Sequence, residues 1–211
     1  IRGRVWNILN SLYQNVMCNV KMGDIVTDFF DIEEGVKQGC VLSPILFCLY
    51  INELSKMLDE YNVGIHIMGV NIKCLFWADD VVLLADNDHD LQRMLNIAAE
   101  FSHKWRLNFN HDKSNVLITG KRINNHKLWQ LGNDYISEVN TYKYLGVHIS
   151  RNLSDHTHLN ETIKKGNRLI GYIKSIINNQ DDFNRVYYGD VLWRSVALPT
   201  IDYACAVSSF S

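Results

Sequence analysis

The amino-acid sequence predicts an α+β fold in which small antiparallel sheets pack on helices. Apolar residues recur at helical spacing in several stretches, and short extended segments between them are joined by turns that contain glycine. The 211 residues are 47% hydrophobic and 21% charged, a balance typical of a globular chain with a packed core. Apolar runs are interrupted well before the ~20 residues of a transmembrane helix, so we expect no membrane span.

The first forty residues predict a helix and a hairpin. Apolar residues at helical spacing indicate an amphipathic helix over residues 4–15. Extended segments follow at 16–22 and 25–32, and Gly23 between them is typical of a hairpin turn.

A nearly all-apolar helix is expected next. Ser43 is suited to the N-cap and Pro44 to the first helical position, and the pattern continues to Asp59. Because most of its faces are apolar, we expect this helix to lie at the centre of the core.

The middle of the chain predicts two hairpins and another helix. Residues 64–68 and 72–77 flank a turn at 69–71, and residues 72–86 have the pattern of a strand, a turn and a second strand. Asn87 or Asp88 then caps a helix that ends at about Trp105.

The last hundred residues change character near residue 150, from mixed helix and strand to helix. This change predicts a domain boundary between residues 1–150 and 151–211. The expected strands lie near residues 115–119, 127–131, 134–137 and 142–149, with a turn at 132–133, and the expected helices cover 154–179 and 184–197.

The start of the chain, its cysteines and its charges indicate the cellular compartment and the kind of partner to expect. The chain opens without methionine inside a predicted helix, so we expect a fragment of a longer protein. Five cysteines without C-x-x-C spacing predict mostly buried free thiols in a reducing compartment, hence an intracellular protein. The net charge is −2, but residues 103–130 hold six bases and one acid, and a second basic run follows at 164–174. These runs are either solvated faces or a path for a polyanion.

Two adjacent carboxylates, Asp79 and Asp80, lie between the apolar residues 75–77 and 81–84. One interpretation is an acidic hairpin tip in solvent. The other is a site for a divalent cation, since carboxylate oxygens suit Mg²⁺ and a charge near a core needs compensation. The long apolar flanks favour the cation.

Two further motifs flank this pair along the chain. Residues 35–44 read GVKQGCVLSP, where glycines on both sides of Lys37 and Gln38 allow a ligand to approach the backbone. Residues 105–114 read WRLNFNHDKS and end on Lys113-Ser114, at a change from helix to strand. Alone, the first motif is a loop before a helix, and the second is a lysine that benefits a helix C-terminus.

Taken together and in this order, GVKQGCVLSPILF, FWADDVVLLA, the Lys113 motif and Tyr144-Leu145-Gly146-Val147 resemble the polymerase core of non-LTR (LINE-like) retrotransposon reverse transcriptases. The resemblance extends from about residue 3 to 205. It implies an incomplete polymerase palm, an antiparallel sheet packed on helices, over residues 1–150, and part of a helical thumb over 151–211. The implied activity is RNA-directed DNA polymerisation by two-metal nucleotidyl transfer.

The resemblance also implies roles for individual residues. Asp79 is similar to the family's metal-binding carboxylate, with Asp80 beside it, and the expected cofactor is Mg²⁺, with Mn²⁺ as an alternative. Lys113 is similar to the lysine near the nucleotide phosphates. Two further groups follow: Lys37, Gln38 and Gly39 for the nucleotide and template, and Tyr144, Leu145 and Gly146 for gripping the primer.

The implied partners are an RNA template, a DNA primer and dNTPs, in the nucleus or in a cytoplasmic ribonucleoprotein. The family's upstream strand, with an F-D-x-V-like motif, has no match here, so we expect a half-site and an inactive isolated chain. Trp77 replaces the usual Tyr or Phe before A-D-D, and it could crowd the primer end. The alternatives are a non-catalytic relic or nucleic-acid-binding palm scaffold, and a group II intron-type maturase polymerase.

Overall fold

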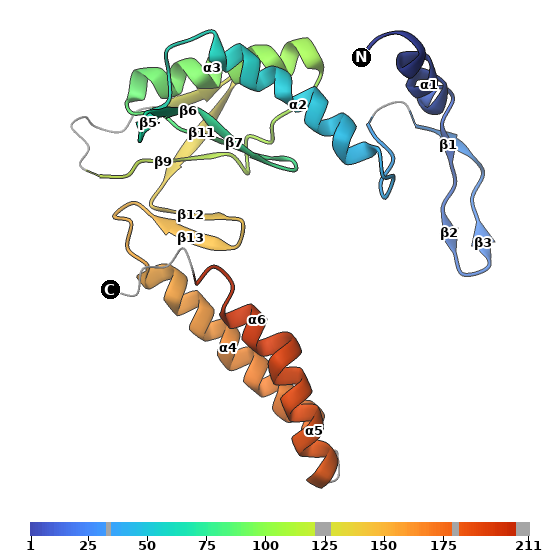
Figure 1. Cartoon of the computed structure of the whole chain (residues 1–211), viewed down its shortest axis with the longest axis vertical. Helices are drawn as coiled ribbons and strands as arrows, with labels where there is room; N and C mark the ends of the chain where they lie inside the picture. Colours follow the sequence, from blue (N-terminus) through green and yellow to red (C-terminus); the bar gives the residue numbers. More distant parts are fainter. Residues whose placement is uncertain (33–34, 121–127, 179–181, 206–211) are drawn as a thin grey trace. The chain divides into compact units, whose positions relative to one another are not determined.

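The computed structural model describes residues 1–32, 35–120, 128–178 and 182–205. The chain divides into two compact units, residues 1–91 and residues 92–211. Helices and small sheets of two or three strands alternate along the chain (Figure 1). The predicted α+β class is therefore confirmed.

The first unit begins with the predicted helix and hairpin. Helix α1 (Gly3–Tyr13) has no buried residue, so its apolar stripe is not covered by the described part of the chain. The hairpin consists of short antiparallel pairs, with Gly23 at a φ of 61° in its turn. Its strands are β1 (Met17–Cys18), β2 (Lys21–Met22), β3 (Ile25–Val26) and β4 (Phe30–Asp31).

Helix α2 (Ser43–Asp59) has the predicted extent, but its N-terminus differs from the prediction. Ser43 is the first helical residue rather than the N-cap, and its Oγ donates a hydrogen bond to the carbonyl of Lys37 at 2.6 Å. The N-cap position belongs to Leu42. The serine hydroxyl thus fixes the preceding loop and leaves the helix N-terminus uncapped by a side chain.

The buried apolar residues of α2 lie in its C-terminal half. Ile51, Leu54 and Leu58 in its C-terminal half are buried, whereas Ile45 and Leu49 are more than half exposed. The prediction that the whole helix lies at the centre of the core is therefore wrong for its N-terminal half.

Two hairpins complete the first unit. Strands β5 (Ile65–Ile67) and β6 (Val70–Ile72) are joined at Met68-Gly69, slightly earlier than predicted. Strands β7 (Cys74–Trp77) and β8 (Asp80–Leu83) form the predicted hairpin around the aspartate pair.

Helix α3 (Asp88–Trp105) contains the junction of the two units. The side chain of Asn87 accepts a hydrogen bond from the Asp90 N–H at 2.9 Å, which confirms Asn87 as the capping residue. The sheet that follows has the strand order β10-β11-β9, with β9 parallel to β11 and a β10–β11 turn at Gly132. Its strands are β9 (Asn115–Leu117), β10 (Trp129–Leu131) and β11 (Asp134–Val139).

The second unit ends in a hairpin and a set of helices. The strand predicted near 142–149 is a hairpin, β12 (Thr141–Tyr144) and β13 (Val147–Ser150), because Leu145-Gly146 forms a turn. The last helices are α4 (His156–Ile177), α5 (Asp182–Leu192), the π-helix η1 (Trp193–Ala197) and α6 (Leu198–Ile201). The predicted end of the first of these helices, Asn179, lies outside the described residues. The predicted domain boundary at 150 falls at the end of β13 and stays a prediction.

All five cysteines are free, as predicted, but none is buried: Cys48 and Cys205 are exposed and the other three are partly exposed. The prediction of mostly buried thiols is therefore wrong. Among the described helices, none combines the length and apolarity needed to cross a membrane.

Candidate functional site

Asp79 and Asp80 lie at the tip of the β7–β8 hairpin. Trp77 pairs with Asp80, which leaves Ala78 and Asp79 as a two-residue loop. Ala78 has a φ of 51°, a left-handed conformation that is strained for a residue with a Cβ and that occurs often at functional sites. Both carboxylates are exposed, and within the described residues neither has a hydrogen-bond or ion-pair partner. Their oxygens are therefore free to bind a cation.

The two faces of the β7–β8 hairpin have different surroundings. Directly opposed residues share a face, so Leu75, Trp77 and Asp80 lie on one side and Cys74 and Phe76 on the other. The first face is open, with Trp77 64% exposed. On the second face, the Cys74 thiol makes a hydrogen bond with a serine of α2, and burial raises the pKa of Cys74. One face thus contacts α2 at Cys74, and the other presents Trp77 beside Asp80.

Lys73 fixes the direction of the hairpin on α2. Its Nζ donates to the carbonyl of Leu58 at 3.0 Å and to that of Tyr61 at 2.9 Å, at the C-terminal end of the helix. The next residue, Cys74, contacts Ser55, which is one turn earlier in α2. Strand β7 therefore starts at the C-terminal end of α2 and runs toward its N-terminal end, where the glycine loop begins the helix.

The glycine loop forms a tight turn. The N–H of Cys40 donates to the carbonyl of Lys37 at 3.2 Å, and Gly39 at the third position has a φ of 77°, as a type II turn requires. Gln38 is exposed at the corner of this turn. A Cβ built on Gly39 meets no atom within 4 Å, so the backbone at this point is open to a ligand.

Two residues that sequence reasoning did not assign to the site hold this loop. Ser43 is only 6% exposed, and besides its bond to the loop its Oγ lies 3.4 Å from the hydroxyl of Tyr13 in α1. The Lys37 ammonium lies 5.9 Å from the centre of the Tyr13 ring, a cation–π distance. The only sequence signal was the Ser43-Pro44 pair, which predicted a helix cap instead.

Cys40 lies just before α2, close to Leu42 and Ser43. Hydrogen bonding to the backbone at Leu42 lowers the pKa of the Cys40 thiol, and Ser43 acts in the same direction. Lys37 contributes in the same direction. The donors at this helix start are therefore directed toward the loop rather than satisfied within the helix.

Lys113 lies in the second unit, in the loop before β9. Its N–H donates to Asn110, whose backbone carbonyl and side-chain Oδ1 are both at 3.2 Å. Ser114 closes the same turn through its Oγ, which donates to the Asn110 carbonyl at 2.8 Å. The Lys113 side chain is exposed and its ammonium has no ion-pair partner in the described part of the chain. The turn therefore presents a free positive charge on a fixed backbone.

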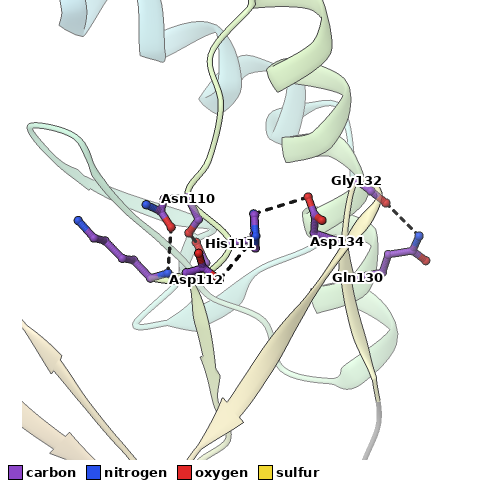
Figure 2. A network of polar contacts seen from close by, with 8 residues as sticks. Asn110, His111, Asp112, Gln130, Gly132 and Asp134 are labelled. Carbon is purple, nitrogen blue, oxygen red and sulfur yellow. Dashed lines mark hydrogen bonds and ion pairs between the residues drawn. The ribbon is translucent and has the colours of Figure 1, made fainter.

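His111 ties this loop to the sheet. Figure 2 shows the imidazole between two carboxylates: Nε2 lies 3.6 Å from Asp112 and Nδ1 lies 3.6 Å from Asp134 at the start of β11. These contacts are ion pairs when the imidazole is protonated. Because β11 pairs with β9, the loop is connected to the same sheet at both ends.

The hairpin that contains Tyr144, Leu145 and Gly146 lies beside the Lys113 loop. The Tyr142 hydroxyl donates to the Lys113 carbonyl at 3.4 Å, so the structure brings together two elements that are far apart in the sequence. Leu145 and Gly146 form the turn, with φ values of 46° and 84°. Sequence reasoning did not identify Tyr142 as the link.

Only part of the two basic runs lies within the residues that the structure describes. Lys121, Arg122 and Lys127 of the first run lie outside the described residues. In α4, Lys164 is exposed and pairs with Glu161 at 2.7 Å, and this hydrogen bond lowers the pKa of Glu161. The charge of Lys164 is thus partly neutralised within its own helix.

The elements described above lie in a part of the chain that matches a known protein family. The chain matches the family described as "Reverse transcriptase (RNA-dependent DNA polymerase)" over residues 5–149, a segment that includes the glycine loop, the aspartate turn, Lys113 and the turn of the β12–β13 hairpin. The chain belongs to the reverse transcriptase family. This reverse transcriptase domain is a member of the RNA-directed DNA polymerases, which are nucleotidyltransferases and in general depend on divalent metal ions.

Three relatives show which branch of the reverse transcriptases it resembles. The domain is 29% identical over 153 residues to "Retrovirus-related Pol polyprotein from type-1 retrotransposable element R2" of Popillia japonica, which is 68% of this chain and 25% of that protein. It is 27% identical over 168 residues to "Probable RNA-directed DNA polymerase from transposon X-element" of Drosophila melanogaster (74% and 17%). It is 27% identical over 135 residues to "RNA-directed DNA polymerase from mobile element jockey" of Drosophila funebris (61% and 14%).

The predicted resemblance to non-LTR retrotransposon reverse transcriptases is therefore confirmed. The domain spans a quarter or less of the length of these relatives.

Proposed function

We propose that this reverse transcriptase domain contributes the later part of the palm, residues 1–150, and the beginning of a helical thumb, residues 151–211, to a protein that extends a DNA primer on an RNA template. The observation that supports the proposal best is the aspartate turn. Two exposed carboxylates without protein partners lie at the tip of a hairpin that is anchored on α2. A purely structural turn has no need to keep two adjacent charges open at its tip.

The chemistry of this donor set fits Mg²⁺, with Mn²⁺ as a substitute. Mg²⁺ is commonly held by one or two carboxylates together with substrate phosphates and water, and Asp79 and Asp80 supply two carboxylates. No group of three or more His, Cys, Asp or Glu that could enclose a metal occurs among the described residues, so the rest of the shell comes from elsewhere. When bound, the cation stabilises the charge that develops on the phosphate oxygens during transfer.

The other residues bind and orient the substrates. The type II turn presents the Gln38 amide and the open Gly39 backbone to the templating base and the incoming nucleotide, with Lys37 behind them. The free Lys113 ammonium attracts the nucleotide phosphates and donates a proton to the departing pyrophosphate.

The primer and its setting complete the proposal. The hairpin turn at Tyr144, Leu145 and Gly146 holds the primer strand near its 3′ end. The partners of the whole protein are then an RNA template, a DNA primer and dNTPs, inside the nucleus or in a cytoplasmic ribonucleoprotein.

A primer-extension assay on the whole protein tests this function. A fluorescent DNA primer annealed to RNA is incubated with dNTPs and Mg²⁺, and products are resolved by length. We expect extension that requires RNA template and divalent cation and that stops with EDTA. A folded protein that binds the duplex but incorporates no nucleotide under any metal would instead be a nucleic-acid-binding scaffold without chemistry.

A further inference from the structure

The turn of the β12–β13 hairpin has a backbone that its own sequence does not favour. Tyr144 pairs with Val147, so Leu145 and Gly146 form a two-residue loop, and both have positive φ. This is the pattern of a type I′ turn, for which Asn-Gly is preferred. Leucine at the first position is disfavoured because its Cβ crowds the backbone in the left-handed region. A contact from outside the hairpin would offset this cost.

Tyr203 provides that contact. Its hydroxyl donates a hydrogen bond to the Leu145 carbonyl at 2.6 Å, across 58 positions of sequence. Its ring lies against Gly146, since a Cβ built on that glycine would be 2.9 Å from the Tyr203 Cε1. The glycine therefore serves two purposes: it accepts the φ of 84° and it leaves room for the tyrosine ring.

The same helical assembly holds the other end of the hairpin. The N–H of His148 in β13 donates to Nδ1 of His158 in α4 at 3.4 Å, and His158 is 6% exposed. Ser150 at the end of β13 donates through its Oγ to the Ser154 carbonyl at 2.8 Å, just before α4. The base of the hairpin is thus attached to the start of α4.

Helix α6 connects the two attachment points. A Cβ built on Gly166 in α4 would lie 3.7 Å from a side-chain carbon of Ile201, so this glycine allows α6 to pack closely on α4. Tyr203 follows α6 directly, and α4 and α6 lie together below the hairpin (Figure 1). The hairpin is therefore held at its base by α4 and at its turn by Tyr203.

We propose that Tyr203 is a positioning residue that locks the Leu145–Gly146 turn against the helices and thereby sets where the hairpin meets the primer. The inference rests on the proposed function, because it assigns the hairpin to the primer. Tyr203 acts through the turn rather than on the reacting atoms. The segment that follows α6 therefore controls how firmly the primer end is held.

Hydrogen exchange tests the lock independently of polymerase activity. In Tyr203→Phe the ring stays and the hydrogen bond to Leu145 is lost, so we expect amides of residues 145–147 to exchange about fivefold faster, the effect of one neutral hydrogen bond. Tyr172→Phe is the matched control, because Tyr172 is exposed on α4 and its hydroxyl has no role in the hairpin. Unchanged exchange in Tyr203→Phe, or equal acceleration in the control, overturns the lock.

A double-mutant cycle tests the ring. Gly146→Ala combines an unfavourable φ with a clash against Tyr203, whereas in a Tyr203→Ala background only the φ strain remains. We expect Gly146→Ala to lower the unfolding midpoint less in that background than in the wild type. Additive effects would overturn the assigned ring contact.

Steady-state kinetics of the whole protein test the link to the primer. For Tyr203→Phe we expect the KM for primer–template to rise about fivefold while kcat stays within twofold, and Tyr172→Phe to leave both unchanged. Faster exchange at the turn without a change in this KM would overturn the positioning role while leaving the polymerase function intact. An inactive wild-type protein would instead contradict the proposed function. The hydrogen-exchange result would still decide whether Tyr203 stabilises the Leu145–Gly146 turn.

Discussion

At the scale of single residues, Asp79 and Asp80 differ from an ordinary acidic turn in what surrounds them. Ala78 before them has a strained left-handed φ of 51°, and the hairpin behind them is bonded to α2 through Lys73. Gly or Asn at the same position would remove this strain. The strain is consistent with a turn selected for the position of its carboxylates.

Paramagnetic Mn²⁺ tests the cation at this turn. When Mn²⁺ is added to the 211-residue chain, we expect the amide resonances of residues 78–81 to broaden at lower concentrations than those of other acidic segments, because two adjacent carboxylates bind a cation better than isolated ones. Asp79→Asn should remove this preference, and Asp86→Asn, a change at an exposed acid outside the turn, should not. First broadening in residues 24–31 would contradict the assignment.

Contacts between distant residues were what the sequence could not reveal. The contact of Ser43 with Tyr13 and the bond from Tyr203 to Leu145 join segments whose relative position depends on tertiary packing. A serine beside a proline predicts a helix cap from local propensity alone, and that prediction was wrong because the loop competed for the hydroxyl.

At the scale of elements, local pattern was sufficient for most helices and hairpins. Helix α2 has the predicted bounds, and Asn87 caps α3, because periodicity and capping depend on neighbours in sequence. Burial was less predictable. The N-terminal half of α2 and all of α1 keep apolar side chains exposed, which periodicity does not distinguish from a core face.

The link between α2 and the aspartate hairpin is the element-scale prediction. Lys73→Met keeps the apolar stem but removes the donors to Leu58 and Tyr61, so we expect the free energy of unfolding to fall by about 1–3 kcal/mol. Lys56→Met is the control, since Lys56 is exposed and pairs with Glu53 in its own helix, and it should change stability by less than about 0.5 kcal/mol. Urea unfolding measures both, and equal effects would argue against the anchor.

At the scale of the whole molecule, the pH dependence of stability has a definite sign. Burial and then nearby Lys143 hold the pKa of His148 below its ordinary value of 6.5, with His158 and Lys165 acting in the same direction and Glu161 opposing them. Near and below pH 6.5, the unfolded chain therefore binds more protons than the folded chain. The free energy of unfolding consequently decreases as the pH falls through this region.

The corresponding measurement is thermal unfolding between pH 7 and pH 5. We expect the melting temperature to fall on acidification, and to fall less in His148→Gln, which cannot take up the proton. Glu161 has a lowered pKa, so its stabilising contribution is complete above its ordinary value of 4.5 and does not change within this window. A melting temperature that rises between pH 7 and pH 5 in the wild type, or an equal fall in both proteins, would contradict this account.

Activity is also a property of the whole molecule. The described residues place two carboxylates at the hairpin tip but no group of three or more ligands around a metal. We therefore expect the isolated 211-residue chain to incorporate no dNTP on a primed RNA template. Extension by this chain alone, dependent on Mg²⁺ and lost in Asp79→Asn, would show that the carboxylates present are sufficient.

The most direct test of the central claim compares two aspartates in the whole protein. Asp79→Asn keeps the size of the side chain and removes the charge that we propose binds the cation, so RNA-templated primer extension should fall about 10³-fold. Asp86→Asn, seven positions later and outside the turn, should retain the wild-type rate. Normal extension by the Asp79→Asn protein would contradict the claim that this turn carries the chemistry.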